Sequence, residues 1–117
     1  MEYCVPVFNG GLTFKHVENL ERIQKRVCKI ILGPDYTDYE SALRICKLEK
    51  LETRRRNLCV AFAQSLLDNS QCKELLPKKK NISISLRHIP NFTQIKCKTV
   101  RFRKSAIPYF IDLLNAT

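Results

Sequence analysis

Long apolar runs are missing from this sequence, and so are the short motifs that most often carry chemistry. No stretch approaches the roughly 20 apolar residues that a membrane-spanning helix needs, and the chain does not open with the basic-then-apolar pattern of a secretory signal. Glycine occurs only at Gly10, Gly11 and Gly33, which form no phosphate-binding loop. We therefore expect an intracellular chain, cytoplasmic or nuclear, with no membrane partner.

Metal-binding patterns are absent as well. The six cysteines include no Cys-x-x-Cys pair, and neither His16 nor His88 is placed to complete a zinc set or a catalytic motif with Ser or Cys. Cys28, Cys46 and Cys59 lie in helical patterns, where a thiol behaves as a small buried hydrophobe. We expect free thiols, no bound metal and no cofactor.

Length and composition indicate a small globular protein. The chain has 117 residues, of which 44% are hydrophobic and 27% charged, so disorder of the whole chain is not expected. A domain of this size buries roughly two thirds of the surface that its unfolded chain exposes. A modest core is therefore possible.

Positive charge is concentrated in the C-terminal third. The net charge is +10; residues 1–77 carry 12 Lys and Arg against 10 Asp and Glu, whereas residues 78–117 carry 9 against 1. Self-repulsion of this size opposes compaction. The tail therefore either stays loose or meets a polyanion, most often a nucleic acid.

The spacing of apolar residues predicts three main helices in residues 1–77. Thr13 caps the first helix, residues 14–32, which stops at Gly33 and Pro34. The second is short and begins at Thr37 or Asp38, with a capping box between Thr37 and Glu40. The first helix has these apolar residues at helical spacing: Leu20, Ile23, Val27, Ile30 and Ile31.

The third helix, residues 50–68, contains an arginine triplet. Its expected apolar stripe consists of Leu51, Leu58, Phe62 and Leu66. Three successive residues advance about 300° around a helix, so the three arginines cannot share one face. Arg55 stands four residues after Leu51, and we expect its stem to pack beside the stripe with its head at the rim.

The composition changes after Pro77. β-branched and aromatic residues alternate with cations, which predicts short strands at residues 82–85 and 99–103 within an arm. A closing helix begins at Ser105 and tolerates Pro108 in its first turn. Its residues available for docking are Phe110, Ile111 and Leu114. The expected fold is mostly α: a small bundle of three main helices in residues 1–77, then a basic extended arm and a short closing helix in residues 78–117.

The order of these elements resembles the segment that follows the catalytic palm, the thumb segment, in reverse transcriptases of non-LTR retrotransposons, especially jockey-like elements. The matching stretches are EYCVPVF at 2–8, LERIQKR at 20–26, Leu48 with LETRR at 51–55, and TVRFRKSAIPYFIDLLN at 99–115. Their combined order is more specific than any one of them. Phe8 and Leu114 depart from the family, in which Trp is frequent at both places; this chain has no Trp.

The resemblance implies a fragment of the RNA-directed DNA polymerase of a transposable element. In the family the first stretch ends a helix that starts further upstream, so we expect Met1 to be an internal methionine or a truncated start, and residues 3–8 to be exposed enough for self-association. The family's reaction uses two metal ions held by carboxylates, among them an adjacent Asp pair. No Asp-Asp pair occurs here, and Asp35 and Asp38 are better explained by turn and cap chemistry, so the isolated chain is not expected to be an enzyme.

The leading functional hypothesis is residual, sequence-independent binding of RNA or DNA through phosphate contacts. The rings of Phe92, Phe102 and Tyr109 either stack on unpaired bases or pack in the core. The candidate phosphate contacts are Arg54, Arg55, Arg56, Lys78, Lys79, Lys80, Lys96, Lys98, Arg101, Arg103 and Lys104.

Two alternatives stay open. In the first, the helices form a protein-interaction module, and residues 78–80 form a nuclear-import or acidic-partner patch. In the second, the chain is a non-functional pseudogene product. Salt-sensitive binding to any oligonucleotide distinguishes the leading hypothesis from the protein-interaction module.

Overall fold

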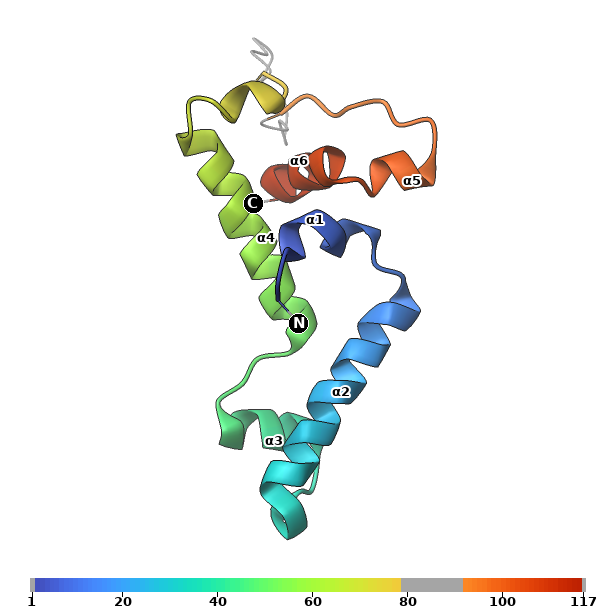
Figure 1. Ribbon diagram of the computed structural model, residues 1–117, viewed down its shortest axis with the longest axis vertical. Helices are drawn as coiled ribbons and strands as arrows, with labels where there is room; N and C mark the ends of the chain where they lie inside the picture. The colour runs from blue at the N-terminus through green and yellow to red at the C-terminus, as the bar shows by residue number, and fades with distance from the viewer. Residues whose placement is uncertain (1, 79–91, 117) are drawn as a thin grey trace. The chain divides into compact units, whose positions relative to one another are not determined.

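The regular elements of the chain are helices. The structure is a computed structural model that describes residues 2–78 and 92–116, and the regular elements in these two ranges are helices, which confirms the expected mostly α fold (Figure 1). The expected strand at residues 82–85 lies outside the described residues. The elements are α1 (Val5–Phe8), η1 (Asn9–Gly11), α2 (Phe14–Leu32), η2 (Gly33–Asp35), α3 (Tyr39–Cys46), α4 (Leu51–Asp68), η3 (Lys73–Leu75), α5 (Val100–Arg103) and α6 (Ala106–Ala116).

The chain forms two compact units. One, here called the core unit, combines Met1–Gly11 with Leu58–Thr117, and the other, the α2–α3 unit, is Leu12–Asn57. The division that we expected at residues 77 and 78 does not coincide with these units. The reason is that α6 contributes to the same apolar cluster as α1 and the second half of α4.

Local signals set the ends of α2 and α3. The Thr13 hydroxyl accepts a hydrogen bond from His16 N (3.4 Å) at the start of α2, and Gly33 ends that helix with φ +53°. Only a residue that tolerates the left-handed region fits there. Asp38 occupies the position before α3 and makes no side-chain cap bond, so the predicted capping box of Thr37 and Glu40 is wrong.

A small apolar cluster joins α2 to α3. Cys28 is 0% exposed and lies against Ala42 and Leu43, with Tyr36 and Tyr39 packed around them. Burial, together with the neighbouring Cys46, raises the pKa of the Cys28 thiol. Cys28 and Cys59 are fully buried, as predicted for cysteines in helices. Cys46 is half-buried, and all six cysteines are free thiols.

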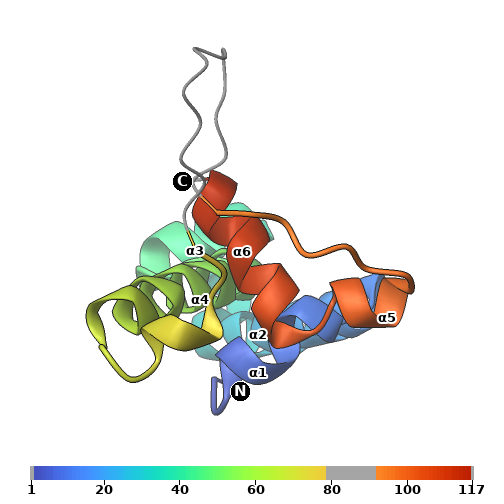
Figure 2. The ribbon, with the colours of Figure 1, turned by 90° about the horizontal axis from the view of Figure 1, so that it is seen from above.

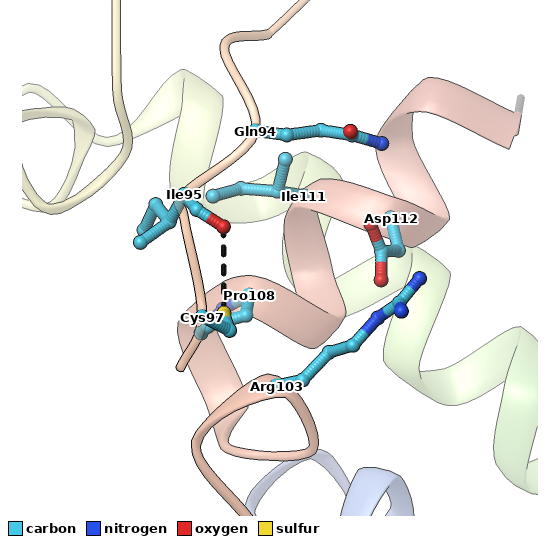
Figure 3. A pocket seen from close by; sticks show the side chains of 7 residues that line it. All are labelled: Gln94, Ile95, Cys97, Arg103, Pro108, Ile111 and Asp112. Atoms are coloured by element: carbon cyan, nitrogen blue, oxygen red, sulfur yellow. Dashed lines mark hydrogen bonds between the residues drawn. The ribbon is translucent and has the colours of Figure 1, made fainter. Parts of the chain in front are cut away.

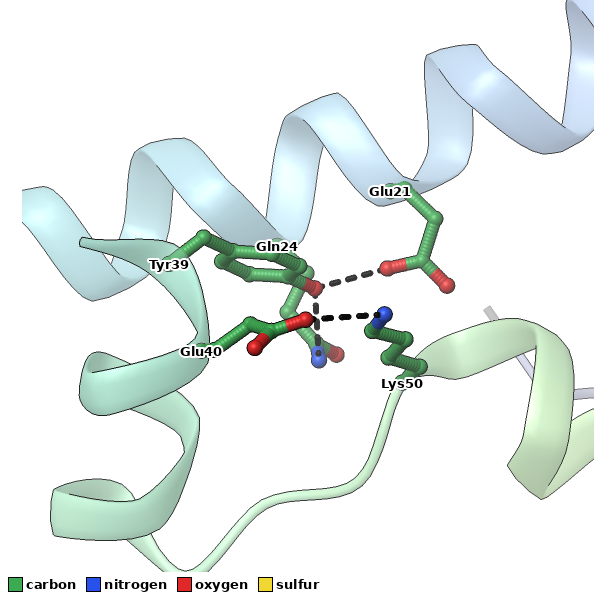
Figure 4. Close-up of polar contacts among 5 residues, drawn as sticks. All are labelled: Glu21, Gln24, Tyr39, Glu40 and Lys50. Atoms are coloured by element: carbon green, nitrogen blue, oxygen red, sulfur yellow. Dashed lines mark hydrogen bonds and ion pairs between the residues drawn. The ribbon is translucent and has the colours of Figure 1, made fainter.

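Glu21 is the centre of the polar network in the α2–α3 unit (Figure 4). Its carboxylate accepts a 2.6 Å hydrogen bond from the Tyr39 hydroxyl and a 2.9 Å bond from the backbone N of Glu52. Gln24 Nε2 donates to the Tyr39 hydroxyl and to the carbonyl of Glu49. The network therefore links α2 to α3 and to the first turn of α4.

Removal of the Tyr39 hydroxyl tests this network. Burial, and then the hydrogen bond to Glu21, raises the pKa of Tyr39 above its ordinary value near 10. Because the folded-state pKa is the higher one, this contribution to stability is complete below about pH 10 and is lost as the pH rises further. We expect Tyr39→Phe to lower the free energy of unfolding by about 0.5–1.5 kcal/mol at pH 8, since the site is partly open to solvent.

The measurement is urea unfolding at pH 8 and between pH 10 and 11. The wild-type chain should lose more stability over this interval than Tyr39→Phe does. Tyr36→Phe, which removes a hydroxyl from the same cluster, is the matched control and should follow the wild type. Parallel losses in wild type and Tyr39→Phe would show that the Glu21 network is not what holds the hydroxyl protonated.

Apolar side chains of α6 are buried in the core unit. Phe110, Ile111 and Leu114 are 3%, 1% and 5% exposed, which confirms the predicted docking residues, and Pro108 is also buried in the first turn. Val5 of α1 belongs to the same cluster, and α1 lies beside α6 (Figures 1 and 2). Of the N-terminal apolar segment, Tyr3 and Val7 remain exposed.

The buried face of α4 differs from the predicted stripe. Leu51 and Leu66 are buried as expected, but Leu58 and Phe62 are 39% and 42% exposed. The residues that follow each of them are fully buried instead: Cys59 and Ala63. Small side chains at these places let other elements approach α4 closely, and Cys59 Sγ lies 3.9 Å from the carbonyl of Val5.

Candidate nucleic-acid interface

Five cations stand within residues 96–104, here called the basic strap. All five are exposed, and Asp112 is the one acidic residue between positions 92 and 116. No described ion pair involves any of them. The members of the basic strap are Lys96, Lys98, Arg101, Arg103 and Lys104.

The second half of the basic strap is a helical turn. The strand predicted at residues 99–103 is wrong, because α5 occupies Val100–Arg103. The Thr99 hydroxyl accepts from Phe102 N (3.2 Å), and the Ser105 hydroxyl donates to the carbonyl of Phe102 (2.6 Å). These local bonds favour a turn. Val100 is 71% exposed, so burial of its side chain does not stabilise a strand at this place.

Hydrogen bonds connect the segments on both sides of the basic strap to other parts of the core unit. At one end Phe92 N donates to Asn115 Oδ1 (2.9 Å), and Asn115 Nδ2 donates to the carbonyl of Phe92 (3.3 Å). At the other end Asn9 Nδ2 donates to the Tyr109 hydroxyl (2.9 Å), and Tyr109 N donates to the carbonyl of Ser105. These bonds set where the cations emerge.

Gly10 permits the close approach of η1 to the end of α5. A Cβ at Gly10 would lie 2.8 Å from the carbonyl oxygen of Lys104 and 2.8 Å from Cγ of Tyr109. We expect Gly10→Ala to lower the free energy of unfolding by about 1–3 kcal/mol, because backbone must move to make room. Chemical denaturation followed by circular dichroism measures it. Gly11→Ala is the matched control, since a Cβ there meets nothing within 4 Å, and equal effects of the two substitutions would contradict the packing described.

A cleft opens between the basic strap and α6 (Figure 3). Its volume of about 210 Å³ is below the roughly 300–1,000 Å³ typical of small-molecule sites. The Arg103 side chain extends toward Asp112 in this cleft (Figure 3). Asp112 and Gln94 were not among the predicted site residues, and the one sequence signal for Asp112 is that it is the single acidic residue in a basic tail. The lining residues are Gln94, Ile95, Cys97, Arg103, Pro108, Ile111 and Asp112.

The arginine triplet belongs to the α2–α3 unit and not to the core unit. Arg54 and Arg56 are exposed. Arg55 is 1% exposed, so its head as well as its stem is buried, and the rim position that we predicted is wrong. Burial removes Arg55 from the candidate phosphate contacts.

The remaining candidate contacts are three lysines and three aromatic rings, and the structure separates them by exposure. Lys78 is exposed, whereas Lys79 and Lys80 lie outside the described residues. Phe92 is 5% exposed and Tyr109 packs against the core, as the core interpretation of these rings predicts. Phe102, on α5 among the cations, is 46% exposed. Of these three rings it is the most exposed.

Other classes of site find no support in the described part of the chain. Residues 2–78 and 92–116 contain no group of three His, Cys, Asp or Glu side chains that could hold a metal ion. None of the helices described is long and apolar enough to cross a membrane. Comparisons with models of protein families, with curated proteins and with solved structures give no match to this chain.

Proposed function

We propose that the chain binds RNA or DNA through phosphate contacts made by the basic strap, without reading sequence. The observation that carries this proposal is the set of five exposed cations within residues 96–104, opposed by a single nearby carboxylate. Lys and Arg that neutralise phosphates release condensed counterions, which favours binding irrespective of base sequence. The cations project from a segment anchored at both ends, so less order has to be created on binding.

Stacking adds a second contribution. Phe102 lies between Arg101 and Arg103 in α5 and is half exposed. A base stacked on an aromatic ring contributes about 1–3 kcal/mol and tolerates any sequence. Single strands with unpaired bases therefore gain a contact that duplexes lack.

The family resemblance gives this activity a context. We propose that the chain derives from the thumb segment of a jockey-like reverse transcriptase, which in that family follows the palm that performs polymerisation. The sequence has no adjacent Asp pair to hold two metal ions. On this proposal the chain keeps a nucleic-acid contact of the parent enzyme and is not itself a polymerase.

Binding to unrelated oligonucleotides across a salt series tests the proposal. For roughly five neutralised phosphates, the slope of log affinity against log salt should lie between about −4 and −5 for duplex DNA and near −3.5 for single strands. Several sequences should bind about equally, because backbone contacts carry no base information. A preference of about 1–3 kcal/mol for one sequence would instead indicate base readout, and absence of binding at low salt would refute the proposal.

A further inference from the structure

The apolar side chains of α2 lie on the surface of the molecule. Ile23 is 50% exposed, Val27 45%, Ile30 73% and Ile31 64%. At about 100° per residue, all four project within a sector of about 100° around the helix. They form an exposed apolar ridge, and α2 buries Cys28, which lies outside this sector. The helical spacing of these residues was visible in the sequence, but their exposure was not predicted.

One edge of the apolar ridge is positively charged. Arg26, Arg22 and Lys29 come next around the helix on that edge, and all three are exposed. On the other edge α2 turns toward α3, where Cys28 packs in the shared cluster and Glu21 binds the Tyr39 hydroxyl. The ridge is therefore bordered by cations on one side and by α3 on the other.

We propose that the apolar ridge of α2 binds an acidic amphipathic helix of a partner protein. Such a helix would place its apolar stripe against Ile23, Val27 and Ile30 and its Asp and Glu residues beside the cations. Charge complementarity identifies the partner, because Arg22, Arg26 and Lys29 make the free edge of the ridge positively charged. This surface belongs to the α2–α3 unit and shares no residue with the basic strap.

Charge and geometry argue against two other occupants of the apolar ridge, a second copy of the chain and a membrane surface. A second copy of the chain, docked ridge to ridge with its α2 antiparallel, would bring the cationic edge with Arg22 and Arg26 toward the same edge of the other copy. A membrane surface requires an amphipathic helix to lie with its apolar face sunk between headgroups, but α3 occupies one edge of this ridge. An acidic helix needs only the free edge and the ridge itself.

The probe is a labelled peptide of about three heptads, with Leu at positions a and d and Glu at e and g, whose self-pairing the Glu residues oppose. One control peptide carries Lys in place of Glu, and another has the same composition in shuffled order. Fluorescence anisotropy with the full chain should show binding of the Glu peptide at least about tenfold tighter than of either control.

Two variants locate the binding surface. The triple variant Ile23→Gln/Val27→Gln/Ile30→Gln keeps every cation and should weaken binding of the Glu peptide about tenfold or more. The control Ile45→Gln, at a site on α3 that is 61% exposed, should leave that binding unchanged. Arg22→Glu/Arg26→Glu keeps the apolar residues and should reverse the preference toward the Lys peptide. Circular dichroism spectra verify that each variant keeps its helices.

Several outcomes would overturn the proposal. Equal binding of the shuffled peptide, or no loss in the triple Gln variant, would show that the net charge alone attracts acidic peptides. Failure of the Glu peptide to bind would remove the acidic helix as partner. If the triple variant instead abolished binding to phosphatidylserine vesicles, or dissociated a dimer of the chain, a membrane or a second copy would be the occupant.

Discussion

Truncation of Phe110 to alanine is expected to lower the free energy of unfolding by about 3–5 kcal/mol. The Phe110 side chain is 3% exposed, and its ring centroid lies 5.6 Å from that of Phe62 and 6.2 Å from that of Tyr109. The substitution removes buried apolar surface and leaves a cavity that neighbouring helices can fill only in part. Since small domains are stable by about 5–15 kcal/mol in total, this loss is a large share of the stability of the chain.

Phe14→Ala is the matched control for Phe110→Ala. It removes the same atoms, but from a side chain that is 84% exposed at the start of α2, so its effect should stay within about 0.5 kcal/mol. Urea unfolding monitored by circular dichroism measures both. A loss below about 1 kcal/mol in Phe110→Ala would contradict the placement of α6 in the core.

The positions of the helices could be predicted well from the sequence because local chemistry determines them. Thr13 is a residue type that accepts hydrogen bonds from the next turn, and Gly33 supplies the positive φ at which α2 ends. Both features act within a few residues, so no knowledge of the rest of the chain is needed. The closing helix follows the same logic, with Pro108 tolerated in its first turn.

The buried faces of the helices were harder to predict, because burial depends on which elements pack together. In α4 the large side chains of Leu58 and Phe62 suggested the inner face, yet Cys59 and Ala63 are the buried residues. Small residues allow close packing between elements, and a hydrophobicity pattern ranks them below Leu and Phe. The exposed ridge of α2 shows the same limit, since apolar spacing marks a stripe without showing what covers it.

The candidate site was predictable in charge but not in shape. The cluster of cations at residues 96–104 is visible in the sequence, and the structure leaves all five exposed. Alternation of β-branched residues with cations suggested a strand, but Thr99 and Ser105 provide the local bonds of a helical turn. The approach of Arg103 to Asp112 depends on the packing of α6, which no local signal reveals.

Neutralising the basic strap is expected to have the largest effect on binding. Replacing Lys96, Lys98, Arg101, Arg103 and Lys104 by Gln should weaken nucleic-acid binding on the order of 100-fold or more at low salt, and about equally for unrelated sequences. Stability should change little, since exposed cations on such a segment contribute little to folding. Asp112→Asn, which removes the carboxylate near Arg103, should strengthen binding.

A matched control separates site from net charge. A second variant loses five exposed cations outside the basic strap, so its net charge falls by the same amount as that of the strap variant. If overall charge alone attracts the nucleic acid, the two variants should weaken binding equally. The control replaces the following residues by Gln: Lys15, Arg22, Lys25, Arg44 and Lys73.

The salt dependence of duplex DNA binding by these three proteins tests the central claim most directly. The wild-type chain and the control variant should both show a slope of log affinity against log salt between about −4 and −5, and the strap variant should show a much flatter one. An unchanged slope in the strap variant, or no binding by the wild-type chain at low salt, would contradict phosphate binding by residues 96–104.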